Sequence, residues 1–397
     1  MIRRLVGVGL FAVALAAYAD MLDFSDAERR QILRHGPWPL AWSPDPSNRV
    51  SGQRAAIEFG RELFFESRLS GTGTVRCSTC HLEAFAFQDG RVTGAALGVV
   101  ERNTPSVLDV RLRRWFGWDG ANDSLWSQSV RPLLDSREMN SSAAHIGRLL
   151  RTDPDLRRHY QATFGTAPGT DDEALLADVG KALAAFQETL VSGRSPFDDF
   201  RDALARDDEK AAARFSLAAQ RGLRIFIGRG NCSLCHFGAN FTNDEFADVG
   251  IPFFVAPGKV DPGRHGGIAK LKQNRFNLLG PYNDDPTRRT ATGTRHVEAQ
   301  HRNFGEFRVP SLRNVARTAP YMHNGRLAML RDVVKHYSEI DLDRLHADGE
   351  QILKPLRLPE NEIDDVVAFL ESLTEHAAAR AESNRIETTE KKQERFK

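Results

Sequence analysis

Apolar residues recur at helical spacing in several stretches of the chain, and these stretches alternate with others that show no period. The spacing predicts helices over 25–34, 54–65, 143–160, 173–191, 216–227, 327–337 and 360–373. The segment 35–50 is rich in Pro and Trp, and 244–292 is rich in Gly, Pro and Asp, so they predict an irregular strap and a long loop region. The pattern therefore predicts a mainly α protein with long irregular loops.

The two ends of the chain depart from this globular pattern. A basic start precedes an almost wholly apolar run, and Ala17-Tyr18-Ala19 forms a small-x-small cleavage site before Asp20. The apolar run is too short for a comfortable membrane span. We therefore expect 1–19 to be a signal peptide, with an uncleaved anchor as the alternative, and the mature protein to be periplasmic with no membrane span. The charged segment 376–397 predicts a disordered tail.

Composition agrees with a globular protein of roughly two domains. The 397 residues are 41% hydrophobic and 27% charged. The net charge of +1 gives no reason to expect a nucleic-acid partner. The charge-rich segment 198–213 predicts a junction, so we expect one unit over 20–205 and a second over 206–375.

All four cysteines of the chain belong to two copies of one motif, C-x-x-C-H. The copies are Cys77-Ser78-Thr79-Cys80-His81 and Cys232-Ser233-Leu234-Cys235-His236. Two thiols one helical turn apart can each form a thioether with a haem vinyl group, and the adjacent histidine then offers Nε2 to the iron. Zinc is the main alternative, but such sites usually bring two C-x-x-C pairs together or end in spaced histidines; disulfides are a third. We expect two covalently bound haem c groups.

The first motif has no second axial ligand close to it in sequence. Neither His nor Met occurs between His81 and Met139. The simplest expectation is an iron with one open face, which a peroxide or oxygen ligand needs. Trp118, Gln128 and Glu138 follow in this stretch and could serve such a ligand, although tryptophans are ordinarily explained by core packing.

The haem motifs and several further runs together resemble the bacterial di-haem cytochrome c peroxidase and MauG family. The runs are N-T-P-S-V at 103–107, W-D-G at 118–120, V-P-S-L-R-N at 309–314 and T-A-P-Y-M-H-N-G at 318–325. The match extends from about Arg54 to about Leu373. The resemblance implies two cytochrome c-like haem domains that face each other, in an enzyme that acts on hydrogen peroxide.

The resemblance also implies roles for residues around the first haem. Trp118 matches the tryptophan that lies between the haems and relays electrons. Gln128 and Glu138 match the distal pair over the peroxide-binding iron, where Glu138 would move a proton between the two peroxide oxygens. Pro132 matches a residue on the same distal face.

An inter-haem calcium site is a further implication of the resemblance. Asn103, Thr318 and Pro320 match its ligands. The asparagine would give a side-chain oxygen and the other two their backbone carbonyls, which suits a hard cation whose shell is completed by water. Turn capping is the alternative explanation for Asn103 and Thr318.

Two departures from the peroxidase pattern point to the MauG-like branch. The loop 91–103 lacks the histidine with which many of these peroxidases block the first iron. Tyr337 stands where many of them carry a methionine ligand to the second haem, as it does in MauG-like members. A phenolate stabilises oxidised iron, whereas a thioether favours Fe(II). Rival ligands are His336, His323 and Met322, and a packed tyrosine is the alternative.

Two enzymatic outcomes and one non-enzymatic outcome follow. Electrons could arrive from a small periplasmic cytochrome c or cupredoxin and reduce peroxide to water. Alternatively, the oxidised haems could draw electrons from a residue of a partner protein, as MauG-like enzymes do. The third outcome is a di-haem electron-transfer cytochrome without peroxidase activity, which predicts that both irons are fully ligated. Gln128 and Glu138 weigh against it.

Overall fold

The computed structural model describes residues 21–251, 254–256, 258–345 and 352–376. The expected signal peptide lies outside these ranges, as does the expected tail from 377 onward. None of the helices within the described ranges combines the length and the apolarity needed to cross a lipid bilayer.

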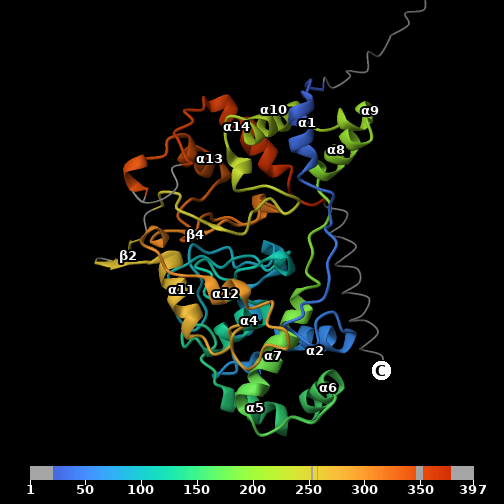
Figure 1. The fold of residues 1–397 in the computed structure, drawn as a ribbon, viewed down its shortest axis with the longest axis vertical. Coiled ribbons are helices and arrows are strands. Elements are labelled where there is room, and N and C mark those ends of the chain that lie inside the picture. The colour runs from blue at the N-terminus through green and yellow to red at the C-terminus, as the bar shows by residue number, and fades with distance from the viewer. Residues whose placement is uncertain (1–20, 252–253, 257, 346–351, 377–397) are drawn as a thin grey trace, which may run out of the picture.

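Two helical halves lie one above the other, and long loops fill the space between them (Figure 1). The lower half contains α2 (Arg54–Phe65), α3 (Cys77–Cys80), α4 (Leu125–Leu134), α5 (Ala143–Thr152), α6 (Pro154–Phe164) and α7 (Asp172–Gln187), with α11 (Gly263–Gln273) and α12 (Thr292–His296) beside them. The upper half contains α1 (Asp26–Leu33), α8 (Pro196–Ala205), α9 (Glu209–Ala212), α10 (Leu217–Ile227), α13 (Leu330–Ser338) and α14 (Glu360–Glu371). The expectation of a mainly α protein built from two facing units is confirmed.

Strands and 3₁₀ turns are short and belong to the loops. β1 (Phe246–Ala247) pairs antiparallel with β4 (Phe307–Arg308), and β2 (Phe254–Ala256) pairs antiparallel with β3 (Lys259–Val260). The 3₁₀ turns are η1 (Ser67–Leu69), η2 (Glu83–Phe85), η3 (Val110–Leu112), η4 (Cys232–Leu234), η5 (His301–Asn303), η6 (Val315–Arg317) and η7 (Leu342–Arg344).

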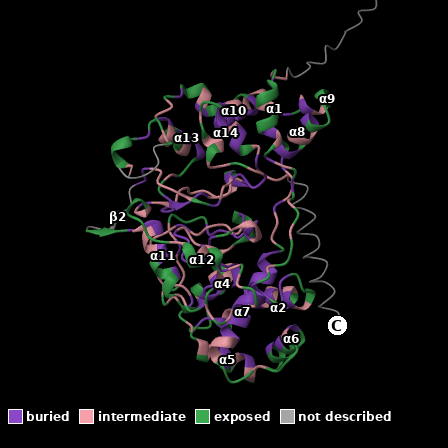
Figure 2. Cartoon of the chain, viewed as in Figure 1, coloured by how far each residue is buried: buried purple, intermediate pink, exposed green. Residues whose placement is uncertain are grey.

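Each half is organised around one close helix crossing. In the lower half α2 crosses the almost wholly buried α7, and a Cβ added at Gly60 would lie 1.9 Å from the carbonyl oxygen of Ala182. In the upper half α10 crosses α14, and a Cβ at Gly222 would lie 1.9 Å from the carbonyl oxygen of Asp365. Buried residues gather on these helices (Figure 2). The two glycines let the backbones approach to a distance that no larger residue permits.

The two hydrophobic cores draw on segments from both sides of the expected boundary at 205. Phe24 and Ile32 near the N-terminus pack in the upper core, together with Phe197 of α8. Phe276 and Leu278, which come from the second half of the sequence, pack in the lower core. The exchanged segments tie the two halves together, so a single cut in the sequence does not separate the two cores.

Two predictions about helices need correction. The stretch 143–160 forms two helices, because Asp153 accepts hydrogen bonds from the first amides of α6 and Pro154 occupies its first position. The prediction of a long loop over 244–292 is wrong, since α11 lies within it. This helix carries Gly263, Gly266 and Gly267, so its sequence gives little apolar period. Its docking depends on close backbone approach, because a Cβ at Gly267 would meet the carbonyl of Asp119 at 2.0 Å.

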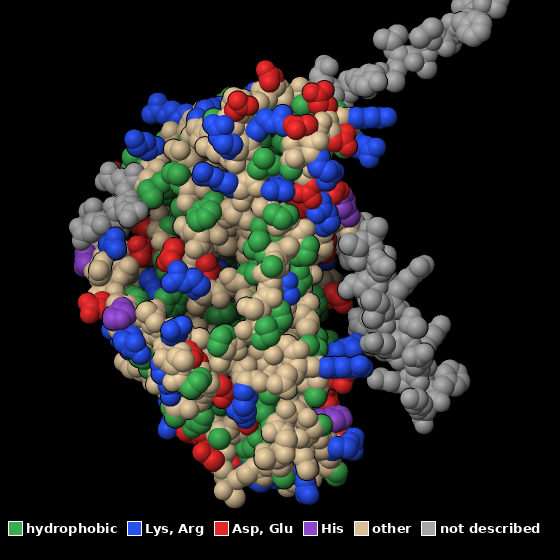
Figure 3. All heavy atoms as spheres, turned by 45° about the vertical axis from the view of Figure 1, so that its right-hand side comes forward, with side chains coloured by type: hydrophobic (Ala, Val, Ile, Leu, Met, Phe, Trp, Pro, Cys, Tyr) green, Lys and Arg blue, Asp and Glu red, His purple; other side chains and the backbone are tan. Residues whose placement is uncertain are grey.

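Charge is spread evenly over the face in Figure 3, where acidic and basic side chains alternate with apolar ones. This agrees with the near-zero net charge of the chain. The segment 198–213, which the sequence predicts to be a junction, forms most of α8 and all of α9 at the edge of the upper core.

We predict that Gly60→Ala and Gly222→Ala each lower the free energy of unfolding of the holoprotein by about 1–3 kcal/mol, because the new methyl group overpacks the crossing. Denaturant titration followed by circular dichroism measures the change. Gly169→Ala is the matched control, because a Cβ there meets no atom within 4 Å. Equal stability of all three variants would contradict the close-crossing account.

Candidate active site

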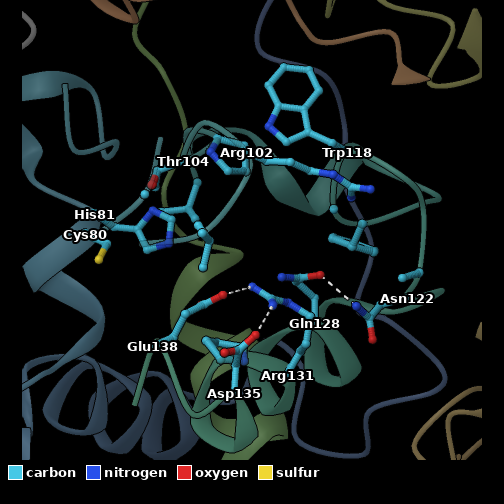
Figure 4. A pocket seen from close by; sticks show the side chains of 18 of the residues that line it. Cys80, His81, Arg102, Thr104, Trp118, Asn122, Gln128, Arg131, Asp135 and Glu138 are labelled. Atoms are coloured by element: carbon cyan, nitrogen blue, oxygen red, sulfur yellow. Dashed lines mark hydrogen bonds and ion pairs between the residues drawn. The ribbon is translucent and has the colours of Figure 1, made fainter. Parts of the chain in front are cut away.

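One cavity of about 640 Å³ lies beside the first C-x-x-C-H motif. Its lining includes many of the residues that the sequence singles out: Cys77, Cys80, His81, Asn103, Trp118, Gln128, Pro132 and Glu138. Lys259, Asp261 and Lys270 also line it, so the second half of the sequence closes one side of a cavity in the lower half. Figure 4 shows Cys80 and His81 along one side and Trp118 and Gln128 along the other.

The first motif presents thiols and an imidazole in the chemical forms that haem attachment uses. Cys77 and Cys80 form no disulfide. Burial raises the pKa of Cys77 to about 12 and that of Cys80 to about 11, so both are neutral thiols. His81 Nδ1 donates to the carbonyl of Phe87 at 2.9 Å, and burial lowers its pKa. A neutral ring held through Nδ1 offers Nε2 to a metal.

The wall around the motif suits a flat apolar macrocycle. Apolar side chains line the cavity from several elements: Phe64, Val75, Val107, Val110, Leu125 and Leu183. Leu82 and Phe85, beside the motif, are exposed large apolar residues, as are Leu234 and Phe237 at the second motif. The thiols, the tethered imidazoles and this apolar surface fit haem c at both motifs.

Gln128 reaches the cavity from α4, whose start is fixed by the hydroxyl of Ser124. Its Oε1 accepts a hydrogen bond from Asn122 Nδ2 at 2.9 Å. Asn122 is itself held, since its Oδ1 accepts from Ser127 and from Asn274. Because the protein engages the amide oxygen of Gln128, its Nε2 is the end that a ligand meets. The buried Asn122 lies outside every motif, and sequence reasoning missed it.

Glu138 lies at the cavity wall in an ion pair with a residue that sequence reasoning also missed. Arg131 Nη2 donates to Glu138 Oε1 at 2.7 Å, and the same guanidinium lies 3.6 Å from Asp135 (Figure 4). Arg131 follows Gln128 by one helical turn, and Pro132 is next to it inside α4. The spacing from Gln128 is the signal that could have identified Arg131. The pair fixes the orientation of the Glu138 carboxylate.

Trp118 lies where the two halves meet. Its Nε1 donates to the carbonyl of Asn103 at 2.8 Å. The amide of Asn103 donates in turn to the carbonyl of His323, and the amide of Arg308 donates to the carbonyl of Trp118, both at 2.8 Å. The carbonyl of Asn103 therefore holds the indole, and the amide of Arg308 holds the main chain of Trp118. Backbone groups are fixed more firmly than flexible side chains.

Charges beside Trp118 are paired and buried. Arg102 contacts Asp119 at 2.7 Å and Asp261 at 2.7 Å, so one cation joins two carboxylates. Burial alone would raise the pKa of Asp119, but Arg102 and Lys270 outweigh it and lower that pKa to about 2. Asp119 is therefore ionised at neutral pH.

The second motif is held in the same way as the first. His236 Nδ1 donates to the carbonyl of Phe241 at 3.1 Å, and burial lowers its pKa to about 4. Behind it lies His35, which stacks on Phe241 with ring centroids 4.7 Å apart. Sequence reasoning missed this contact, because His35 belongs to the irregular strap.

Tyr337 on α13 is the member of the predicted ligand set that lies near the second motif. Burial raises the pKa of its phenol, and Cys232 and Cys235 raise it further, which indicates that the ring is close to both thiols. Two of its rivals are engaged elsewhere. His336 Nε2 donates to the carbonyl of Val249 at 2.7 Å, and His323 stacks on Phe307 with centroids 3.4 Å apart.

The segment 318–320 lies against the lower half near Asn103. Gln88 Nε2 donates to the carbonyl of Ala319 at 2.7 Å. Gln88 Oε1 is buried and lacks a hydrogen-bond partner, which makes it an oxygen that a cation could satisfy. Within the described ranges, no three residues among His, Cys, Asp and Glu come together as a metal-ligand group, so the zinc alternative has no ligand set there.

Comparison with known proteins gives consistent results. A family model for di-haem cytochrome c peroxidase matches residues 54–206. The chain is 33% identical to the methylamine utilization protein MauG of Methylorubrum extorquens, over 85% of this chain and 82% of that protein. It is 30% identical to the cytochrome-c peroxidase IdrP1 of Pseudomonas sp. strain SCT, over 92% and 90%. A solved MauG-like protein associated with microbial copper homeostasis aligns with a TM-score of 0.65 and 27% identity, over 86% of this chain and 96% of that one.

Fold, motifs and cavity thus define a di-haem, peroxidase-type oxidoreductase. The chain belongs to the di-haem cytochrome c peroxidase and MauG family, as the sequence motifs predict. Membership implies two haem c groups, one at each C-x-x-C-H motif.

Proposed function

We propose that the protein is a periplasmic enzyme that reduces hydrogen peroxide at the first haem site. Its electrons would come from a small electron-donor protein, such as a cytochrome c or a cupredoxin, or from a residue of a partner protein. The proposal rests on one observation, which is that His81, Gln128 and Glu138 line the same cavity. The secretory-type start of the sequence and the two c-type motifs support a periplasmic location.

Several side chains that line the cavity would each have a separate role in peroxide reduction. Haem held by Cys77, Cys80 and His81 supplies an iron at which the O–O bond of peroxide is cleaved. Glu138 accepts the proton from one peroxide oxygen and delivers it to the other, while Arg131 holds its Oε1. Gln128 Nε2 donates a hydrogen bond to the ligand. Two electrons and two protons convert each peroxide to two waters.

Trp118 would carry electrons between the two haem sites. It lies in the cavity wall, and its Nε1 is bonded to a carbonyl whose own residue is bonded to the upper half. The hydrogen bond to Asn103 stabilises the positive charge that an indole gains on oxidation. This arrangement favours an enzyme that shares oxidising equivalents between two sites over a simple electron carrier.

We predict that Glu138→Gln slows peroxide consumption by about 100-fold, because the amide cannot carry the proton. Stopped-flow measurement of peroxide loss in the holoprotein gives the rate. Asp135→Asn is the matched control, because Asp135 contacts the same arginine and lines the same cavity. It should stay within a few-fold of wild type. If both variants turn over peroxide at the wild-type rate, Glu138 has no role in proton transfer.

The second haem site differs in its expected ligand. Tyr337 is partly buried, and burial together with Cys232 and Cys235 of the second motif raises the pKa of its phenol. We propose that it coordinates the second iron as a phenolate, which would lower the reduction potential of that site and let it hold oxidising equivalents.

Tyr337→Phe should therefore change the electron paramagnetic resonance signal of the second iron only, and leave the first unaltered. Tyr321→Phe is the control, because its hydroxyl bonds the carbonyl of Val315 in the same half. Identical spectra for wild type and Tyr337→Phe would remove the phenol from the ligand set.

Calcium is the third part of the proposal. We propose that Asn103, Thr318 and Pro320 bind one Ca²⁺ between the halves. The unsatisfied oxygen of Gln88 beside Ala319 supports an oxygen-ligand site at this place.

Elemental analysis of the dialysed holoprotein should find about one calcium per chain, and Asn103→Ala should reduce this to about a tenth. Gln88→Leu, which removes the unsatisfied oxygen, is expected to weaken calcium retention during dialysis against a chelator. Wild-type protein that holds no calcium would rule the site out.

A further inference from the structure

Cations cover most of the indole rings of this protein. All five tryptophans lie in the described ranges. Four of them have a cation over the ring, at these distances to the ring centroid: Trp38 with Arg313 at 3.6 Å, Trp115 with Arg264 at 4.3 Å, Trp42 with Arg111 at 5.3 Å and Trp126 with Lys181 at 5.5 Å. Within the described residues no such contact is found for Trp118.

A cation over an indole opposes oxidation of that indole. The neutral ring attracts the cation through its quadrupole. Loss of one electron gives the ring a positive charge, and the same cation then repels it. Trp118 differs, because no described cation lies over its ring and its Nε1 donates to the carbonyl of Asn103. The ionised carboxylate of Asp119, in the next residue, is offset by its ion pair with Arg102.

Trp115 gives the clearest case, since it lies three residues before Trp118 and is buried. Arg264 is sandwiched between Trp115 and Phe246, at 4.3 and 4.0 Å from the two ring centroids. Arg264 is 3% exposed, and its guanidinium donates to the carbonyls of Asp119 and Gly120. No described carboxylate forms an ion pair with it, and Asp119, Glu245 and Glu306 act on its charge only from beyond ion-pair distance.

The other covering cations differ in how much of their charge is offset. Lys181 pairs with Asp284 at 2.7 Å, and Arg313 pairs with Asp198 at 2.9 Å. The carboxylates weaken the field of these two cations at their indoles. Arg111 forms no ion pair among the described residues, but it lies 5.3 Å from its ring centroid, whereas Arg264 lies 4.3 Å from that of Trp115. Arg264 is therefore the cation whose removal should have the largest effect.

We propose that the cations over the other tryptophans restrict oxidation to Trp118, and that Arg264 is the residue that excludes Trp115 from the electron path. The inference rests on the proposed reduction of peroxide. When no donor protein is present, a tryptophan supplies the two electrons. The balanced reaction converts the indole and one H₂O₂ to a hydroxylated indole and one H₂O.

The test uses the holoprotein, treated with a few equivalents of hydrogen peroxide in the absence of any donor. Peptide mass spectrometry measures the gain of one oxygen at each tryptophan. Arg264→Met should raise oxygen incorporation at Trp115 by about 10-fold over wild type, because the opposing charge is gone. Arg264→Lys keeps the charge and should stay within about 2-fold of wild type. A purely structural role for Arg264 would make both variants alike.

Lys181→Met provides a second variant, with Trp126 as its reporter, should Arg264→Met fail to fold. If a folded variant consumes peroxide but its reporter tryptophan gains no more oxygen than in wild type, the inference is wrong. The proposed function is then unaffected. A wild-type protein that does not consume peroxide overturns the proposed function, and the inference falls with it.

Discussion

Arg102 joins two parts of the sequence that lie far apart, at the point where the candidate chemistry takes place. It contacts Asp119 of the lower half and Asp261, which precedes α11, each at 2.7 Å. Both carboxylates are buried, so removal of the guanidinium would leave two uncompensated negative charges away from water. Because Asp119 follows Trp118 and Arg102 precedes Asn103, this one cation also fixes the two residues that hold the indole between the halves.

The cavity follows from the same constraint. Its floor and apolar wall belong to the lower half, but Lys259, Asp261 and Lys270 come from the second half of the sequence. Two distant parts of the sequence therefore share one site, and a change in how α11 docks would alter the surroundings of Trp118 and Gln128 together. This explains why backbone hydrogen bonds at Asn103, His323 and Arg308 converge there.

The sequence predicted those parts of the protein that depend on local pattern. The C-x-x-C-H motifs have a chemical signature, and helices such as α2 and α10 have a periodic one. The fold class and many of the residues that line the cavity beside the first motif could therefore be predicted. The helix α11 was missed because its packing depends on glycine rather than on an apolar stripe. Arg131 was missed although its partners Asp135 and Glu138 are near it in sequence. Asn122 and Arg264 were missed because distant segments give ordinary polar residues their roles. Their partners are known only once the chain has folded.

The placement of α1 has a consequence for the order of assembly. Phe24 and Ile32 pack in a core that also contains Phe369 and Leu373, near the other end of the described chain. Because ribosomes make the N-terminus first, this early segment lacks its direct partners until α8 and α10 have been synthesised, and the complete core until Leu373 has been made. The residues of the lower core are closer together in the sequence, so all of them are available at an earlier point in synthesis. The N-terminal segment therefore cannot join its core when it is first made, but only after α8 and α10 have followed it.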